Sequence, residues 1–119
     1  MKRFLFLFFA LGLVSIPVSA GENVPARIQD LLAFVEDSGV TFIRNGTKHN
    51  ATDAAEHLRK KRDHYQKDIR TPEDFIRLTA TKSLVSGKKY QVVTREGKTL
   101  LASDWLLAAL GRLRAAAPQ

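Results

Sequence analysis

Hydrophobic residues recur along this chain at two spacings, one typical of helices and one typical of strands. After Asn23, which suits a helix N-cap, apolar residues fall at i, i+3, i+4 and i+7. They are Ile28, Leu31, Leu32 and Val35. Residues 40–44 then read as a strand, Asn45-Gly46 is typical of a tight turn, and residues 47–49 can return beside the first strand. The pattern predicts a helix ending near residues 38–39, followed by a β-hairpin.

Two further helices are predicted in the middle of the chain. Asn50 and Asp53 resemble a capping box, and the helix that they open is expected to run to about Lys67. Its apolar side consists of Ala54, Ala55, Leu58 and Tyr65. Thr71, followed by a proline and two acids, predicts the start of the next helix. The buried side expected for that helix consists of Phe75, Ile76 and Leu78.

The last third of the chain predicts a second hairpin and a last helix. Residues 90–94 and 99–101 read as strands, and Glu96-Gly97 between them reads as a turn. Ser103 is expected to cap the helix that follows. Its core-facing residues are expected to be Trp105, Leu106, Ala109, Leu110 and Leu113.

The order of elements is helix, hairpin, helix, and then the same again. At an offset of 51 residues, Gly46 matches Gly97 and Asp53 matches Asp104. This favours a duplicated unit, although turns and caps recruit glycine and aspartate in any fold. Because a lone two-stranded hairpin is marginal in water, the two hairpins are expected to join in one antiparallel sheet packed on the helices. The predicted class is α+β, with four helices and two β-hairpins.

The first twenty residues have the features of an export signal. Lys2 and Arg3 precede an apolar run over 4–18, and Val18-Ser19-Ala20 supplies small residues at a cleavage site. The run is shorter than the roughly 20 residues that a membrane-spanning helix needs. We therefore predict a signal peptide over 1–20 and a single compact domain over 21–119, periplasmic or secreted, with no stable transmembrane segment after cleavage.

Composition narrows the partners that we expect. The chain has no cysteine, which excludes disulfides, thiolate catalysis and cysteine-ligated metals, and suits a bacterial periplasmic protein. It carries 19 Lys and Arg against 12 Asp and Glu, and five excess cations remain once Lys2 and Arg3 leave with the leader. An acidic envelope protein or an anionic envelope polymer is then the expected partner, and nucleic acid is not. The alternative is that surface lysines serve solubility alone.

Residues 56–62 form the densest polar cluster of the chain. Glu56 is expected to pair with Lys60 at i+4, while His57, Lys61 and His64 form a stripe that can hold a carboxylate or phosphate. The alternative is that these residues form a solvated cationic face of the helix that binds no ligand. Two other hypotheses use the same helix, namely a small hydrolase or lyase acting through Glu56 and His57, and electrostatic attachment to an anionic membrane. The first is disfavoured because adjacent helical residues diverge by about 100°.

The sequence predicts no catalytic, cofactor or metal site. His57 and His64 are seven residues apart, whereas chelation on one helix face requires a spacing of four. No serine follows the glycine-x-serine-x-glycine pattern of a nucleophile elbow. Enzyme activity is therefore not expected.

Four segments resemble the small exported bacterial proteins grouped as domain of unknown function 5329. They are residues 42–46, 54–61, 69–76 and 83–90. The resemblance implies a signal peptide and a compact periplasmic domain, and it implies no established activity. The candidate anion- or partner-binding set combines polar residues of these segments with the helix stripe: Arg44, Asn45, His57, Arg59, Lys61, His64, Ser83 and Tyr90. The sequence thus predicts a non-enzymatic binding or adaptor module for an anionic ligand or acidic partner.

Overall fold

The computed structural model describes residues 21–116, and the predicted signal peptide lies outside them. Within this range the chain forms four α-helices, one short 3₁₀ helix and four strands. Their order is α1 (Val24–Asp37), β1 (Thr41–Arg44), β2 (Thr47–His49), α2 (Ala51–His64), η3 (Gln66–Asp68), α3 (Pro72–Thr79), β3 (Gln91–Val93), β4 (Thr99–Leu101) and α4 (Ala102–Ala116). The predicted α+β class, with two hairpins among four helices, is confirmed.

Side-chain caps start three of the helices. Asn23, Asn50 and Thr71 each accept a hydrogen bond from the backbone N–H three residues on, at 3.1, 2.8 and 3.0 Å. These bonds satisfy N–H groups of the first turn that have no partner inside the helix. The predicted last helix is present, but its predicted cap was wrong, because α4 follows β4 directly at Ala102 and Ser103 lies inside its first turn.

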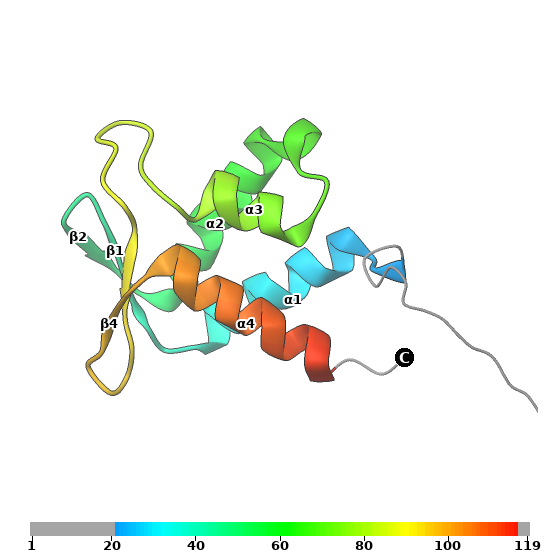
Figure 1. Cartoon of the computed structure of the whole chain (residues 1–119). Helices are drawn as coiled ribbons and strands as arrows, with labels where there is room; N and C mark the ends of the chain where they lie inside the picture. The colour runs from blue at the N-terminus through cyan, green and yellow to red at the C-terminus, as the bar shows by residue number, and fades with distance from the viewer. Residues whose placement is uncertain (1–20, 117–119) are drawn as a thin grey trace, which may run out of the picture.

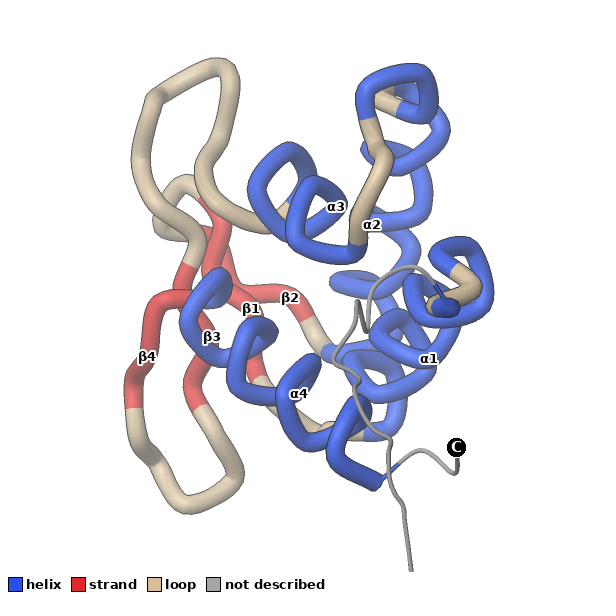
Figure 2. The backbone as a smooth tube through the Cα atoms, turned by 45° about the vertical axis from the view of Figure 1, so that its right-hand side comes forward, coloured by secondary structure: helices blue, strands red, loops and turns tan. Residues whose placement is uncertain are grey.

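The two hairpins join through β1 and β3 into one antiparallel sheet of order β2-β1-β3-β4. Phe42 on β1 lies opposite Val92 on β3, at the centre of the sheet. Asn45 and Gly46 form the first turn with φ of 54° and 75°, as a two-residue hairpin of type I′ requires. All four α-helices lie on one side of the sheet (Figures 1 and 2).

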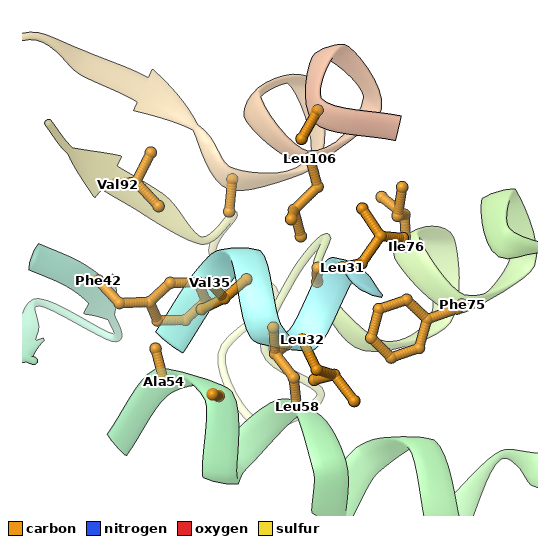
Figure 3. Packing of buried hydrophobic residues seen from close by; sticks show 14 of the residues in the cluster. Leu31, Leu32, Val35, Phe42, Ala54, Leu58, Phe75, Ile76, Val92 and Leu106 are labelled. Carbon is orange, nitrogen blue, oxygen red and sulfur yellow. The ribbon is translucent and has the colours of Figure 1, made fainter. Parts of the chain in front are cut away.

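The buried core surrounds α1, whose Leu31, Leu32 and Val35 are completely buried. Figure 3 shows these side chains between the sheet, where Phe42 lies near Val35, and the side chains of the other helices. The described core lies between Ile28 and Leu110.

Two helical details differ from the sequence prediction. Helix α2 ends at His64 instead of near Lys67, and η3 follows it. On α3, Phe75 and Ile76 are buried as predicted, but Leu78 is only partly buried. Thr79 is buried in its place, because it continues the i, i+3, i+4 and i+7 face that begins at Pro72. Its hydroxyl donates to the backbone oxygen of Phe75 at 2.7 Å.

Candidate functional site

Arg44 and Tyr90 lie opposite each other at one end of the central strand pair. Phe42 and Val92 pair across β1 and β3, and both are buried beneath the helices. Because side chains alternate along a strand, the residues two positions away in the same direction point to that same face. Those residues are Arg44 and Tyr90, and the Tyr90 ring centre lies 5.3 Å from that of Phe42.

Helix α2 brings two side chains onto the Tyr90 hydroxyl. The Nε2 of His57 lies 3.3 Å from Tyr90 Oη, and Lys61 Nζ donates to the same oxygen at 3.2 Å. Lys61 Nζ also donates to the backbone oxygen of Lys82 at 3.3 Å and lies 5.1 Å from the centre of the Tyr90 ring. The i, i+4 spacing of His57 and Lys61 puts both on one helix face, so the stripe predicted from the sequence does face the sheet.

The segment between α3 and β3 closes the site on its other side. Ser83 is buried, and its Oγ accepts hydrogen bonds from the backbone N–H groups of Val85 and Ser86 at 3.2 and 3.4 Å. Gly87, at φ 73°, donates its N–H to the Ser83 carbonyl at 2.9 Å. This short loop, here called the 83–87 loop, therefore has a defined conformation.

These elements line an open hollow of about 350 Å³, here called the α2 pocket. Six of the eight candidate residues predicted from the sequence line it. They are Arg44, His57, Lys61, His64, Ser83 and Tyr90. Lys60 lines the pocket as well, although the sequence assigned it to a pair with Glu56.

Asn45 and Arg59 lie outside the α2 pocket. The Nη2 of Arg59 donates to Glu36 on α1 at 2.7 Å, and its Nη1 lies 3.9 Å from Glu56. The predicted pairing of Glu56 with Lys60 was therefore wrong, since Glu56 contacts Arg59. Asn45, at the tip of the first hairpin, accepts a hydrogen bond from the Ser86 hydroxyl.

The α2 pocket collects cations without carboxylates. Among residues 21–116, no Asp or Glu forms an ion pair with Arg44, Lys60 or Lys61. Burial, reinforced by Arg44 and Lys61, lowers the pKa of His57 to about 4, so its imidazole is neutral at pH 7. Burial, with a contribution from Arg44, also lowers the pKa of Lys61. Burial raises the pKa of Tyr90, whose hydroxyl therefore keeps its proton.

This arrangement suits a bound anion better than acid–base catalysis. Guanidinium and ammonium groups are donors that carboxylates and phosphates accept, and the Ser83 and Tyr90 hydroxyls can add further hydrogen bonds. Glu56 contacts Arg59, whereas His57 contacts Tyr90, so the two residues of the hydrolase hypothesis do not act on a common partner. Within the part of the chain that the structure describes, no group of three His, Asp or Glu side chains could hold a metal ion.

Two other hollows have a different character. The one between α1 and the end of α2, about 430 Å³, contains Arg62 and Asp63, which pair at 3.3 Å and compensate each other. The other, about 260 Å³, shares Arg44, His57 and Lys60 with the α2 pocket, and its lining also includes His49, Asp53 and Glu56. The buried Nε2 of His49 has no hydrogen-bond partner among the described residues. Both hollows have carboxylates in their lining beside the cations, whereas the lining of the α2 pocket has none.

Sequence reasoning missed Lys60, Tyr65, Leu84 and Val85 as pocket residues. Leu84 and Val85 are 69% and 94% exposed and line the pocket from the 83–87 loop. Their signal in the sequence was an apolar pair between Ser83 and Ser86-Gly87, a context typical of a loop, where apolar residues have little to pack against.

No helix among residues 21–116 has both the length and the apolar character needed to cross a bilayer.

Comparisons with known proteins place the chain in a family without assigning it an activity. Over 93 residues the chain is 38% identical to the uncharacterized protein YfeK of Salmonella typhimurium, covering 76% of this chain and 77% of that protein. No solved structure matches it. The model of a family of unknown function, DUF5329, matches residues 22–114, and the chain therefore belongs to this family.

Proposed function

We propose that this protein is an exported, non-enzymatic binding module that holds an anionic group in the α2 pocket. The observation that carries the proposal is the convergence of Arg44, Lys60 and Lys61 on one hollow with no carboxylate paired to them among residues 21–116. The Tyr90 hydroxyl and the neutral His57 complete the lining.

Electrostatics supports an anion at this place. Bringing like charges together and removing them from water costs free energy, and the lowered pKa values of His57 and Lys61 have these two causes. A bound carboxylate or phosphate offsets the repulsion between the cations, because it supplies the missing opposite charge. By contrast, Arg59 already has Glu36 at 2.7 Å and has no such need for a ligand.

A titration tests the binding proposal. Residues 21–119 are titrated with inorganic phosphate and with acetate while backbone amide NMR shifts are recorded. We expect saturable shifts around the α2 pocket, with a dissociation constant for phosphate on the order of millimolar. Lys61→Gln and Arg44→Gln should each weaken binding by roughly fivefold or more, since each removes a charge-assisted contact.

Arg59→Gln is the matched control, because Arg59 lies on the same helix but outside the pocket. It should leave the phosphate titration unchanged. Absence of any saturable shift, or equal weakening by Arg59→Gln and Lys61→Gln, would contradict the assignment of the pocket.

Export is the second part of the proposal. It rests on Lys2 and Arg3, the apolar run over 4–18 and the small residues at 18–20. When residues 1–119 are expressed in a Gram-negative host, the periplasmic fraction should contain a species whose intact mass begins at Gly21. Uncleaved protein confined to the cytosol would refute export, and with it the envelope as the source of an acidic protein or anionic polymer partner.

A further inference from the structure

The 83–87 loop presents an apolar tip at the mouth of the α2 pocket. Among residues 21–116, the large hydrophobic side chains that are exposed are Leu84 at 69%, Val85 at 94% and Leu107 at 45%. Leu84 and Val85 are adjacent in sequence and line the pocket, whereas Leu107 lies apart on α4. Hydrogen bonds to the buried Ser83 hold this loop in shape, so its apolar tip is a fixed feature of the fold.

Lysines surround the base of the same loop. Lys82 and Lys89 form an isolated antiparallel bridge, and the carbonyl of Lys88 accepts the Ser83 N–H at 3.0 Å. All three lysine side chains are exposed. Residues 75–95 contain no Asp or Glu. The loop therefore combines two exposed aliphatic side chains with a collar of three cations, and the cationic pocket lies directly behind it. Figure 1 shows this segment, in yellow-green between α3 and the sheet, extending away from the body of the domain.

We propose that the 83–87 loop docks on a membrane surface that carries anionic phospholipid. Leu84 and Val85 enter the boundary between headgroups and acyl chains, and the three lysines contact lipid phosphates. The α2 pocket receives one headgroup phosphate. The inference rests on the proposed function, because it requires the pocket to accept an anion, and it names the ligand class.

The size and chemistry of the loop favour a bilayer over an acidic protein. A stable protein interface usually takes 20 to 30 residues from each side, whereas this apolar tip consists of two residues on a protruding loop. Peripheral membrane binding needs only a small apolar insertion together with a basic patch. Both elements are present within residues 82–89, and the pocket supplies a specific site for the phosphate.

Vesicle flotation tests the inference. Residues 21–119 are mixed with vesicles of phosphatidylcholine alone or of phosphatidylcholine with phosphatidylglycerol. We expect flotation only with phosphatidylglycerol present, and weaker flotation at high salt. Leu84→Asn combined with Val85→Asn should lower the partition coefficient by about tenfold or more, since it removes the apolar insertion. Leu107→Asn is the matched control for an exposed leucine and should not change the partition coefficient.

The phosphate titration separates this inference from the proposed function. The variant that combines Lys88→Gln and Lys89→Gln changes no residue that lines the α2 pocket, so it should bind inorganic phosphate like the wild type while its flotation with phosphatidylglycerol vesicles weakens. Phosphate binding by the wild type without any vesicle binding would overturn the docking inference and leave the proposed function standing. Full retention of vesicle binding by the variant that combines Leu84→Asn and Val85→Asn would also overturn the inference, because attachment would then be purely electrostatic. If the wild type bound neither phosphate nor vesicles, the docking inference and the proposed function would both be overturned.

Discussion

Replacement of Lys61 by methionine should separate ligand binding from folding. If the cations of the α2 pocket are held for a ligand, removing one should weaken anion binding without weakening the fold. Methionine keeps an unbranched apolar chain that can pack on the Tyr90 ring, where Lys61 Nζ now lies 5.1 Å from the ring centre. The variant therefore removes the charge and its hydrogen bonds and little else.

The expected change in the free energy of unfolding follows from the contacts of Lys61. The Lys61→Met variant loses hydrogen bonds to Tyr90 Oη at 3.2 Å and to the Lys82 carbonyl at 3.3 Å. Both bonds are long and partly solvated, so each contributes about 0.5 kcal/mol. The variant also removes the free-energy cost of burying the ammonium group and of its repulsion by Arg44, the two causes that lower the Lys61 pKa. Because Lys61 is partly exposed, solvent screens both effects, and we expect the loss and the relief to offset each other, so that the free energy of unfolding changes by less than about 0.5 kcal/mol.

Arg59→Met on the same helix provides the comparison. Its guanidinium has a carboxylate partner, Glu36, at 2.7 Å, and both side chains are partly exposed. Loss of this pair should lower the free energy of unfolding by roughly 0.5–1 kcal/mol. Urea unfolding at pH 7 measures both variants, and 1 kcal/mol corresponds to roughly 4–8 °C in melting temperature for a domain of this size.

The sign of the difference decides between the two roles. Lys61→Met should be more stable than Arg59→Met by about 0.5–1 kcal/mol and should bind phosphate more weakly. If Lys61→Met were instead the less stable of the two by more than about 1 kcal/mol, Lys61 would serve the fold, and the reasoning that links its uncompensated charge to a ligand would fail.

Three further predictions concern pH, the core and the turns. Because burial lowers the folded pKa of His57 to about 4 from 6.5, the unfolded chain takes up the proton first as the pH falls. Stability should therefore drop by roughly 1–2 kcal/mol between pH 6.5 and 4, after allowance for partial exposure, and His57→Gln should lose this part of the pH dependence in urea titrations. Phe75→Ala, at a completely buried position, should cost about 3–5 kcal/mol in the same assay, and a cost under about 1 kcal/mol would mean that α3 is not packed as described. Gly46→Ala, at φ 75°, should lower stability by about 1 kcal/mol, whereas Gly111→Ala, inside α4 with open space around it, should raise it by about 0.5–1 kcal/mol. Thermal melts of both glycine variants check the opposite signs.

Local features of the fold could be predicted from the sequence because they depend on a few neighbouring residues. Asn23, Asn50 and Thr71 cap the helices as expected, and Asn45-Gly46 forms the turn of the first hairpin. These features rest on side-chain bonds to nearby N–H groups or on tolerance of positive φ, and both can be recognised in a short stretch of sequence.

Features that depend on distant residues could not be predicted in this way. The pairing of β1 with β3 sets Arg44 opposite Tyr90, and these residues are 46 positions apart in the numbering. Arg59 resembled its neighbours on the basic helix until Glu36, from α1, proved to be its partner. Ser103 resembled a helix N-cap because nothing in the local sequence indicates that β4 continues directly into α4.

The candidate site was predicted as a list of residues rather than as a shape. Six of the eight residues named from the sequence line the α2 pocket, since the basic helix stripe and the segment before β3 both contribute to it. Leu84 and Val85 were missed because their exposure beside the pocket depends on how the 83–87 loop folds back on Ser83. Lys60 and Tyr65 also line the pocket, but the sequence assigned Lys60 to an ion pair with Glu56 and Tyr65 to the apolar side of its helix.

The imidazole of His57 offers the most direct measurement of anion binding in the α2 pocket. Its ring protons can be followed by NMR from pH 3 to 8, with and without saturating inorganic phosphate. In the free protein the pKa should be about 4, held low by burial and by Arg44 and Lys61. Bound phosphate supplies negative charge beside the ring and should raise this pKa clearly. An unchanged pKa of His57 in the presence of phosphate would contradict an anion site in this pocket.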